Sequence, residues 1–398
     1  VFPARYLQTL VQNLELPAEI PATGYSEDFL LERKLTVEFV GVEQLKNPTR
    51  WLSEIDGPPF RDGFALFVLC DDMSQAREAQ ALACDLLRHS QVLLAIPRDP
   101  DNRLSPLIRR HEALRHLQSS QPHLYGEGAD LYEEWHLHSQ DVLETIGSII
   151  KPMTDPEKKL LAWYTDGEEI QGITTRARLT EAASKMMRKA FPLTPRISHA
   201  RLTSEEGRDN FVNARKSIID KLLLRDGADL LARETSNQLK NVITNVYIHN
   251  GILVRDPNGA RFTEPDAQTH EAMSAIWKVV DAFVSKAKRQ SPAPQSMGDL
   301  VAPLKRAPYG LRSRTIPLIV TAVFRDYVFR GNLSFVKRGR PVNQLNGAVI
   351  DDAVMNPDEH ALIFTSIGES HRAILKGLGT AFEVEYDEEN EMAMVDRI

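Results

Sequence analysis

The sequence predicts an α/β domain followed by mainly helical modules. Near-continuous apolar runs of strand length occur in the first hundred residues, and a helical pattern separates two of them. Beyond about residue 200, helical patterns are twice followed by a short hairpin pattern. We therefore expect a parallel-sheet α/β domain at 1–125, a helical connector at 126–200, and winged-helix-like modules at 201–290 and 297–398, the last with an acidic tail.

Three apolar runs predict the strands of the α/β domain, at residues 36–40, 64–69 and 92–96. A helix is predicted to begin after Asp72, with Ser74 as its N-cap, because alanines and leucines then recur at helical spacing. A strand, a helix and a second apolar strand form one β-α-β unit. Its parallel strands are expected to be buried on both faces of the sheet.

Pro97 ends the third strand, and Ser105-Pro106 starts a basic amphipathic helix that runs through Leu117. The stretch that follows, 128–194, is mainly helical in pattern and is broken by prolines. This is the predicted connector.

Two helices are predicted next, at 204–225 and 228–250. The Asn258-Gly259 pair then lies between two short strand patterns, which predicts a β-hairpin over 251–262. A helix at 267–288 and a Ser- and Pro-rich linker at 290–296 follow, and the linker predicts a domain boundary.

The last part repeats this order with different residues. A helix at 297–305, a turn at 307–311, an apolar helix at 315–328 and a hairpin at 333–342 are expected. Helices that pack beside a β-ribbon are the arrangement of winged-helix units, which predicts one such unit on each side of the linker.

Composition limits the class of protein. Of the 398 residues, 42% are hydrophobic and 26% are charged, which is typical of a folded globular chain. No apolar run approaches the roughly 20 residues of a membrane helix, so no membrane association is expected. Two cysteines do not make a disulfide framework, which favours the cytoplasm. The chain begins Val1-Phe2-Pro3 without a secretion signal, and we expect a trimmed fragment of a larger protein.

Asp71 and Asp72 follow the second predicted strand, where a P-loop ATPase carries a carboxylate that holds magnesium. However, the chain has no Gly-x-x-x-x-Gly-Lys-Ser/Thr sequence to bind phosphates. The favoured interpretation is that these acids cap the next helix. The alternative is a metal-dependent nuclease or nucleotide hydrolase of unfamiliar type.

The histidines and serines do not form a recognisable catalytic motif. His136 and His138 are one residue apart, and neither they nor His111 and His116 have the spacing of a zinc site. The stretch 365–371 lacks the first glycine of a nucleophile elbow. We predict no complete catalytic site, no metal site and no cofactor of this chain.

A basic segment is more informative, because only Asp326 opposes its cations. Those cations are Lys305, Arg306, Arg312, Arg314, Arg325, Arg330, Lys337, Arg338 and Arg340. Such a segment can neutralise nucleic-acid phosphates. The candidates for DNA or partner contact are Arg312, Arg314, Lys337, Arg338 and Arg340. The alternatives are a solvated face or a docking site for the acidic tail at 383–391.

Three stretches resemble one family. The first is Phe191-Pro192-Leu193-Thr194-Pro195-Arg196-Ile197, with Asn213-Ala214-Arg215-Lys216 further on; the second is Asn250-Gly251-Ile252-Leu253; the third is Ala307-Pro308-Tyr309-Gly310-Leu311-Arg312 followed by Ile316-Pro317-Leu318. Together they resemble the large P-loop ATPases of bacterial phage-defence islands, of the BREX (BrxC and PglY) and DndH types. The resemblance covers about residues 150–340.

The resemblance implies an ATPase whose phosphate loop, with ATP and magnesium, lies upstream of this region in a multi-subunit defence complex that acts on DNA. Our leading hypothesis is a non-catalytic C-terminal region of such an ATPase, which couples ATP-driven change to DNA or to partner subunits. The rival is a pure protein–protein assembly module without DNA binding.

Overall fold

A computed structural model describes residues 13–85, 88–204, 211–257, 259–329, 333–342, 345–364, 374, 376–378 and 380–382. The chain forms two compact units. Unit 1 comprises residues 1–28 and 32–190, and unit 2 comprises residues 29–31 and 191–398. The stretches 365–373 and 383–398, which include the incomplete nucleophile-elbow motif and the acidic tail named above, lie outside the described residues.

Unit 1 is built on a six-stranded sheet in the order β1-β2-β3-β4-β5-β6. Its strands are β1 (Glu19–Pro21), β2 (Lys34–Gly41), β3 (Phe64–Leu69), β4 (Val92–Pro97), β5 (Leu161–Thr165) and β6 (Glu168–Ile170). The three predicted strands are β2, β3 and β4, and they are parallel as expected. The sheet as a whole is mixed, because β1, β5 and β6 pair antiparallel to their neighbours.

Burial explains the parallel centre of this sheet. Every residue of β3 and β4 is buried, so both faces must be covered. One face packs against α3 (Val42–Leu45), α4 (Thr49–Asp56) and α5 (Met73–Asp85). On β2 and β3 the rings of Phe39 and Phe67 stack at a centroid distance of 5.1 Å, and Trp163 of β5 meets Phe67 edge-to-face at 5.7 Å.

Helix α5 has a different N-cap from the predicted one. Its first residue is Met73, and the Oδ1 of Asp72 accepts a hydrogen bond from the backbone N–H of Gln75 at 2.9 Å. The Gln75 side chain in turn accepts from the N–H of Asp71 at 3.0 Å. The prediction of Ser74 was wrong because the carboxylate before the helix reaches the free N–H groups first.

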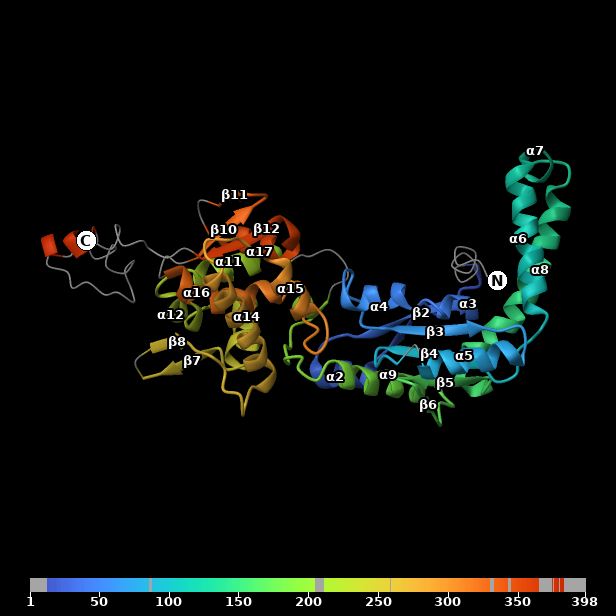
Figure 1. Cartoon of the computed structure of the whole chain (residues 1–398), viewed down its shortest axis with the longest axis horizontal. Helices are drawn as coiled ribbons and strands as arrows, with labels where there is room; N and C mark the ends of the chain where they lie inside the picture. Colours follow the sequence, from blue (N-terminus) through green and yellow to red (C-terminus); the bar gives the residue numbers. More distant parts are fainter. Residues whose placement is uncertain are drawn as a thin grey trace. The chain divides into compact units, whose positions relative to one another are not determined.

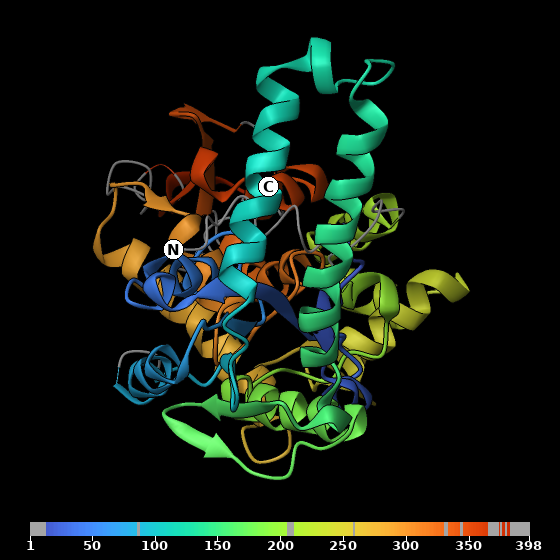
Figure 2. The ribbon, with the colours of Figure 1, turned by 90° about the vertical axis from the view of Figure 1, so that its right-hand side faces the viewer.

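Between β4 and β5 the chain forms a helical hairpin. It consists of α6 (Leu104–Ser120), α7 (Pro122–Tyr125) and α8 (Tyr132–Met153). Figures 1 and 2 show α6 and α8 side by side, extending away from the sheet of their own unit with α7 at the far end. The stretch 126–200 is mainly helical, as expected, and it also supplies β5, β6 and α9 (Arg176–Ala190).

Unit 2 is mainly helical. Its helices are α10 (Ala200–Thr203), α11 (Val212–Leu222), α12 (Gly227–Ala232), α13 (Asn237–Ile243), the π-helical η2 (Thr244–Ile248), α14 (Glu271–Arg289), α15 (Gly298–Lys305), α16 (Ile316–Phe329), α17 (Gly347–Met355) and η3 (Pro357–Glu359). The predicted hairpins are present as β7 (Leu253–Asp256) with β8 (Gly259–Phe262), and as β10 (Leu333–Lys337) with β11 (Arg340–Pro341).

The single helix predicted at 228–250 is wrong. The structure has α12 and α13 instead, separated by a turn at 233–236. The Glu234 carboxylate holds this turn, since it accepts hydrogen bonds from the N–H groups of Thr235 and Ser236 and pairs with Lys221 of α11. A side chain that bonds to nearby backbone groups competes with the helix.

Strands from the predicted linker and from the last module share one sheet, in the order β11-β10-β12-β9. Here β9 is Gln295–Ser296 and β12 is His360–Phe364. Helix α14 packs against both α16 and β12, and one hydrophobic core extends through the unit. Both predicted winged-helix-like modules therefore contribute to one compact unit, and the winged-helix assignment stays a prediction.

The apolar helix α16 lies within this core, with its first nine residues buried. Beside it, the buried Arg215 of α11 pairs with the buried Asp351 of α17, with the second bond at 3.1 Å. No helix in the described part of the chain is long and apolar enough to cross a bilayer.

Candidate interaction surfaces

Two of the three cations of the β10–β11 hairpin are paired with carboxylates. Lys337 pairs with Asp352 of α17, and Arg338 pairs with Glu359 of η3. The Arg338 guanidinium lowers the pKa of the Glu359 carboxyl. Arg340 is exposed at the start of β11. The local sequence around 337–340 is basic, but in the fold two of its three cations lie against carboxylates.

Arg312 and Arg314 precede α16 and are less accessible than the hairpin cations. Arg314 is buried, and its Nη1 lies 3.5 Å from the carbonyl oxygen of Arg201. The next residue, Thr315, donates to the carbonyl of Leu202 at 3.1 Å. Arg312 is half-buried. These contacts give Arg314 a structural role in fastening α10 to the start of α16.

Arg325, another cation of the basic segment, also lies against its own unit. Its Nε donates to the carbonyl of Leu222 at 3.1 Å, and its Nη2 donates to that of Arg225 at 2.7 Å. The guanidinium lies 4.6 Å from the ring centre of Phe329. Burial lowers the pKa of Arg325. This side chain caps the carbonyl groups at the end of α11, which leaves it little capacity for a ligand.

The three stretches that carry the family resemblance meet in unit 2. The N–H of Leu193 donates to the carbonyl of Pro308 at 3.2 Å, and the Thr194 hydroxyl donates to that of Tyr309 at 2.7 Å. Asn250 donates to the carbonyl of Arg196 at 3.3 Å. The stretch 191–197, the turn before α16 and the residues that follow η2 therefore form one hydrogen-bonded junction.

Glycine is required at position 251 of this junction. Its backbone has a φ of 71°, and a Cβ atom there would lie 2.4 Å from the ring of His270. Both the left-handed conformation and the close ring exclude a side chain. Backbone geometry therefore accounts for the glycine of the Asn250-Gly251 pair.

The strand-end acids of unit 1 do not assemble a metal site. Asp72 caps α5, and no group of three His, Cys, Asp or Glu among the described residues could hold a metal ion. The Oδ1 of Asp71 is buried without a hydrogen-bond partner. One such oxygen with no further ligands does not bind magnesium, which takes several oxygen ligands.

A cavity of about 240 Å³ lies at the carboxyl ends of β3 and β4, and Cys70, the residue before these acids, lines it. Its polar lining includes Cys70, Asp99, Asp101 and Arg103. Burial raises the pKa of the Cys70 thiol to about 12, so it is not a thiolate nucleophile at neutral pH. Asp101 pairs with Arg103 at 2.6 Å, and this contact lowers the pKa of the carboxyl. Neither the Cys70 thiol nor the Asp101 carboxylate, which is paired with Arg103, therefore offers an unpaired charge in this cavity.

A larger cavity of about 520 Å³ lies between the loop after β6 and α9. Three cations line it, and they share two carboxylates. Arg178 and Lys185 pair with Glu181 at 2.9 and 3.2 Å, and Lys189 pairs with Asp166. Its charges therefore stabilise α9 and the β5–β6 turn.

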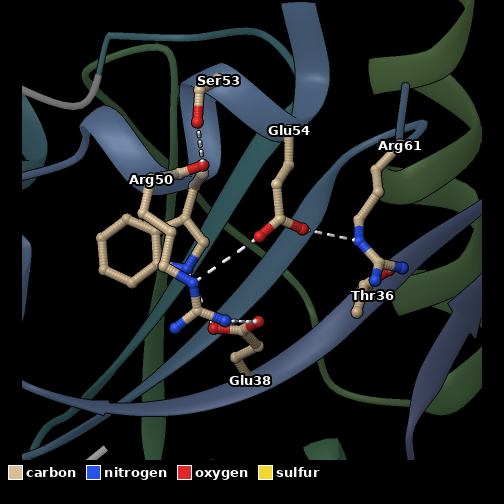
Figure 3. Close-up of polar contacts among 7 residues, drawn as sticks. Thr36, Glu38, Arg50, Ser53, Glu54 and Arg61 are labelled. Atoms are coloured by element: carbon tan, nitrogen blue, oxygen red, sulfur yellow. Dashed lines mark hydrogen bonds and ion pairs between the residues drawn. The ribbon is translucent and has the colours of Figure 1, made fainter. Parts of the chain in front are cut away.

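A polar network joins β2 to α4 and the loop before β3, as Figure 3 shows. Glu38 accepts from Arg50 at 3.0 Å and from the Trp51 indole at 2.9 Å. Arg50 also lies 3.6 Å from Glu54, which pairs with Arg61 at 2.9 Å. Acids and bases alternate along this chain, so the network is neutral and holds α4 on the sheet.

The α6–α8 hairpin differs from all these places, because its charges are not matched internally. A buried seam that includes Ile108, Val142 and Ile146 holds the two helices together. The Trp135 indole donates to the carbonyl of Leu114 at 2.8 Å, and Arg110 contacts the ring of His138. Within 104–153, a part that the structure describes fully, no ion pair joins the two helices.

Exposed leucines accompany these unmatched charges. Leu137 of α8 is 62% exposed, which is the largest exposure among the described large hydrophobic side chains. Leu117, Leu124 and Leu131 towards the tip are also exposed. Clustered exposed apolar side chains mark protein contact surfaces. The basic helix that runs through Leu117 is predictable from the sequence, whereas its pairing with α8 along a shared seam becomes visible only in the fold.

Comparison with known proteins gives no further assignment. No protein-family model matches the chain, and neither a curated protein nor a solved structure is significantly similar to it. The surface chemistry of the two units therefore carries the functional argument.

Proposed function

We propose that this chain is a non-catalytic assembly module of a phage-defence ATPase complex. It binds protein through the α6–α8 hairpin and neither turns over a substrate nor reads nucleic acid. The family resemblance at 191–197, 250–253 and 307–312 supports the setting. ATP and magnesium, if the complex uses them, bind elsewhere in it.

The observation that carries this proposal is the contrast in charge pairing. Among the five candidate cations, Lys337 and Arg338 pair with carboxylates and Arg314 is buried, so three have little capacity for phosphate. The α6–α8 hairpin instead exposes leucines among unmatched charges. This combination favours a protein ligand over a phosphate backbone.

The test compares one substitution on each surface in the native complex. The tagged chain, Leu137→Glu and Arg340→Glu are expressed in the source cell, and the proteins that cross-link to residues 104–153 are quantified. We expect Leu137→Glu to lose these cross-links and Arg340→Glu to retain them. Unchanged cross-linking in Leu137→Glu would contradict the assignment to the hairpin.

DNA contact through the basic segment remains the rival prediction, and a separate measurement decides it. Filter binding of duplex DNA to the purified chain is measured from low to physiological salt. The assembly proposal expects no binding even at low salt. Binding that falls steeply with salt and disappears in Arg338→Glu with Arg340→Glu would restore the DNA hypothesis.

A further inference from the structure

One side of the α6–α8 hairpin carries charges of opposite sign on its two helices. Seven-residue spacing places Arg110 and Leu117 on one side of α6, and the same spacing places Glu134 and Asp141 on one side of α8. Leu137 lies one turn from each of these two acids. We call these five residues the hairpin face.

The contact between Arg110 and His138 shows that the two sides belong to one face. His138 follows Glu134 by four residues and precedes Asp141 by three, so it shares their side of α8. The same contact fixes the register of the hairpin. Along the hairpin, Arg110 lies at the level between Glu134 and Asp141. Neither of these two acids forms an ion pair in the described structure.

Such a face is complementary to itself under one symmetry operation. A two-fold axis along the length of the hairpin would lay α6 of one copy on α8 of the other, with both tips at the same end. A two-fold axis across the hairpin would instead lay α6 on α6 and bring like charges together. Only the first operation places Arg110 of each copy opposite the interval between Glu134 and Asp141 of the other.

We propose that two copies of this chain associate through the hairpin face, as a four-helix bundle in which α6 and α8 alternate. Neighbouring helices then run antiparallel throughout, which is the arrangement of up-down bundles. Leu117 and Leu137 of both copies become buried between the charges. This inference rests on the proposed assembly function and names a second copy as the partner.

The size of the face predicts a weak dimer. Helix α6 has 17 residues and is therefore about 25 Å long. Two helices of about 10 Å width give a face of roughly 500 Å² on each copy, or about 1,000 Å² in total. This is near the lower limit for a specific interface, so we expect a micromolar dissociation constant that rises with salt.

Sedimentation velocity of the purified full chain tests the inference, at concentrations from about 1 to 100 µM. We expect a monomer–dimer equilibrium that Leu137→Glu weakens at least about tenfold. The matched control is Met73→Glu on α5, where the side chain is also exposed, at 43%, and lies outside the hairpin. A monomer throughout this range, or equal dimerisation of wild type and Leu137→Glu, would overturn the inference. Circular dichroism confirms that both variants are folded.

A charge exchange tests the proposed pairing directly. Arg110→Glu makes both helices of the face acidic, and Glu134→Lys with Asp141→Lys makes both basic. Each protein alone should dimerise more weakly than wild type, whereas an equimolar mixture should form a heterodimer. Arg77→Glu on α5 is the charge control and should change nothing. A mixture that associates no better than its separate components would overturn the two-fold pairing.

The two proposals fail separately. If the purified chain stays monomeric while Leu137→Glu still removes cross-links in the native complex, the hairpin binds a different protein and self-association is wrong. If the chain dimerises through the face but the native cross-links reach only copies of itself, self-association stands alone and the proposed role in holding other subunits is wrong.

Discussion

The hairpins α6–α8 and β10–β11 both carry exposed charge, but the fold uses that charge differently. In β10–β11, Lys337 and Arg338 reach carboxylates on α17 and η3 of the same unit. In α6–α8, Arg110 and the acids of α8 form no ion pair, and exposed leucines lie among them. Charges matched within a fold contribute to its stability, and unmatched charges on an exposed apolar face remain available to a partner.

The largest effect is expected when a buried ion pair within unit 2, Arg215 with Asp351, is broken. Arg215→Ala would leave the Asp351 carboxylate buried without its partner, and we expect unit 2 to lose about 3–5 kcal/mol of stability. Urea unfolding, followed by hydrogen exchange in α11, measures this loss. Arg215→Met combined with Asp351→Leu should recover most of it, because no charge is then left buried. Equal losses in the single and double variants would contradict a charge-pairing origin.

A smaller effect is expected at the turn between α12 and α13. Lys221 lowers the pKa of the Glu234 carboxyl, as do the N–H groups of the turn. The folded-state pKa is therefore below the unfolded value, so the stabilisation is present at neutral pH and is lost as the pH falls through the folded-state pKa. Glu234→Gln should cost about 1 kcal/mol at pH 7 and nothing at low pH. Urea midpoints of both proteins across acid pH check this, and a constant difference would exclude the ionised carboxylate as the cause.

The smallest expected effects come from reversing one charge in each of the two hairpins, and they compare the two hairpins directly. Arg110→Glu should leave the thermal midpoint of the monomeric chain unchanged, because this cation has no carboxylate partner to lose. Arg338→Glu should lower it slightly, since Glu359 then faces a like charge. Differential scanning calorimetry at low protein concentration measures both. A larger loss in Arg110→Glu than in Arg338→Glu would show that the α6–α8 charges are structural after all.

Local patterns were sufficient to predict much of the fold. The buried strands β3 and β4, helix α6 and both β-hairpins follow from periodicity and turn residues within a few positions. The N-cap of α5 was misplaced because Ser74 and Asp72 are both good caps and only geometry decides between them. The turn at Glu234 depends on Lys221 of another helix, so the helix pattern alone could not reveal it.

The candidate sites were harder to predict, because charge pairing is a long-range property. Arg338 looks unopposed over 305–340, yet its carboxylate comes from Glu359, beyond that window. Arg215 pairs with Asp351, which lies 136 residues further along the chain. In the same way, the hairpin face needs both α6 and α8, and only their register shows that Arg110 lies between the two acids of the other helix.

The place where the α6–α8 hairpin enters and leaves the sheet has a consequence for how this protein can vary. The chain departs at Pro97 of β4 and returns at Leu161 of β5, and these two residues are direct partners in the sheet. The segment between β4 and β5 thus begins and ends at one pair of neighbouring residues in the sheet. Inserting or removing whole helical turns in this segment would therefore leave the pairing of β4 with β5 unchanged.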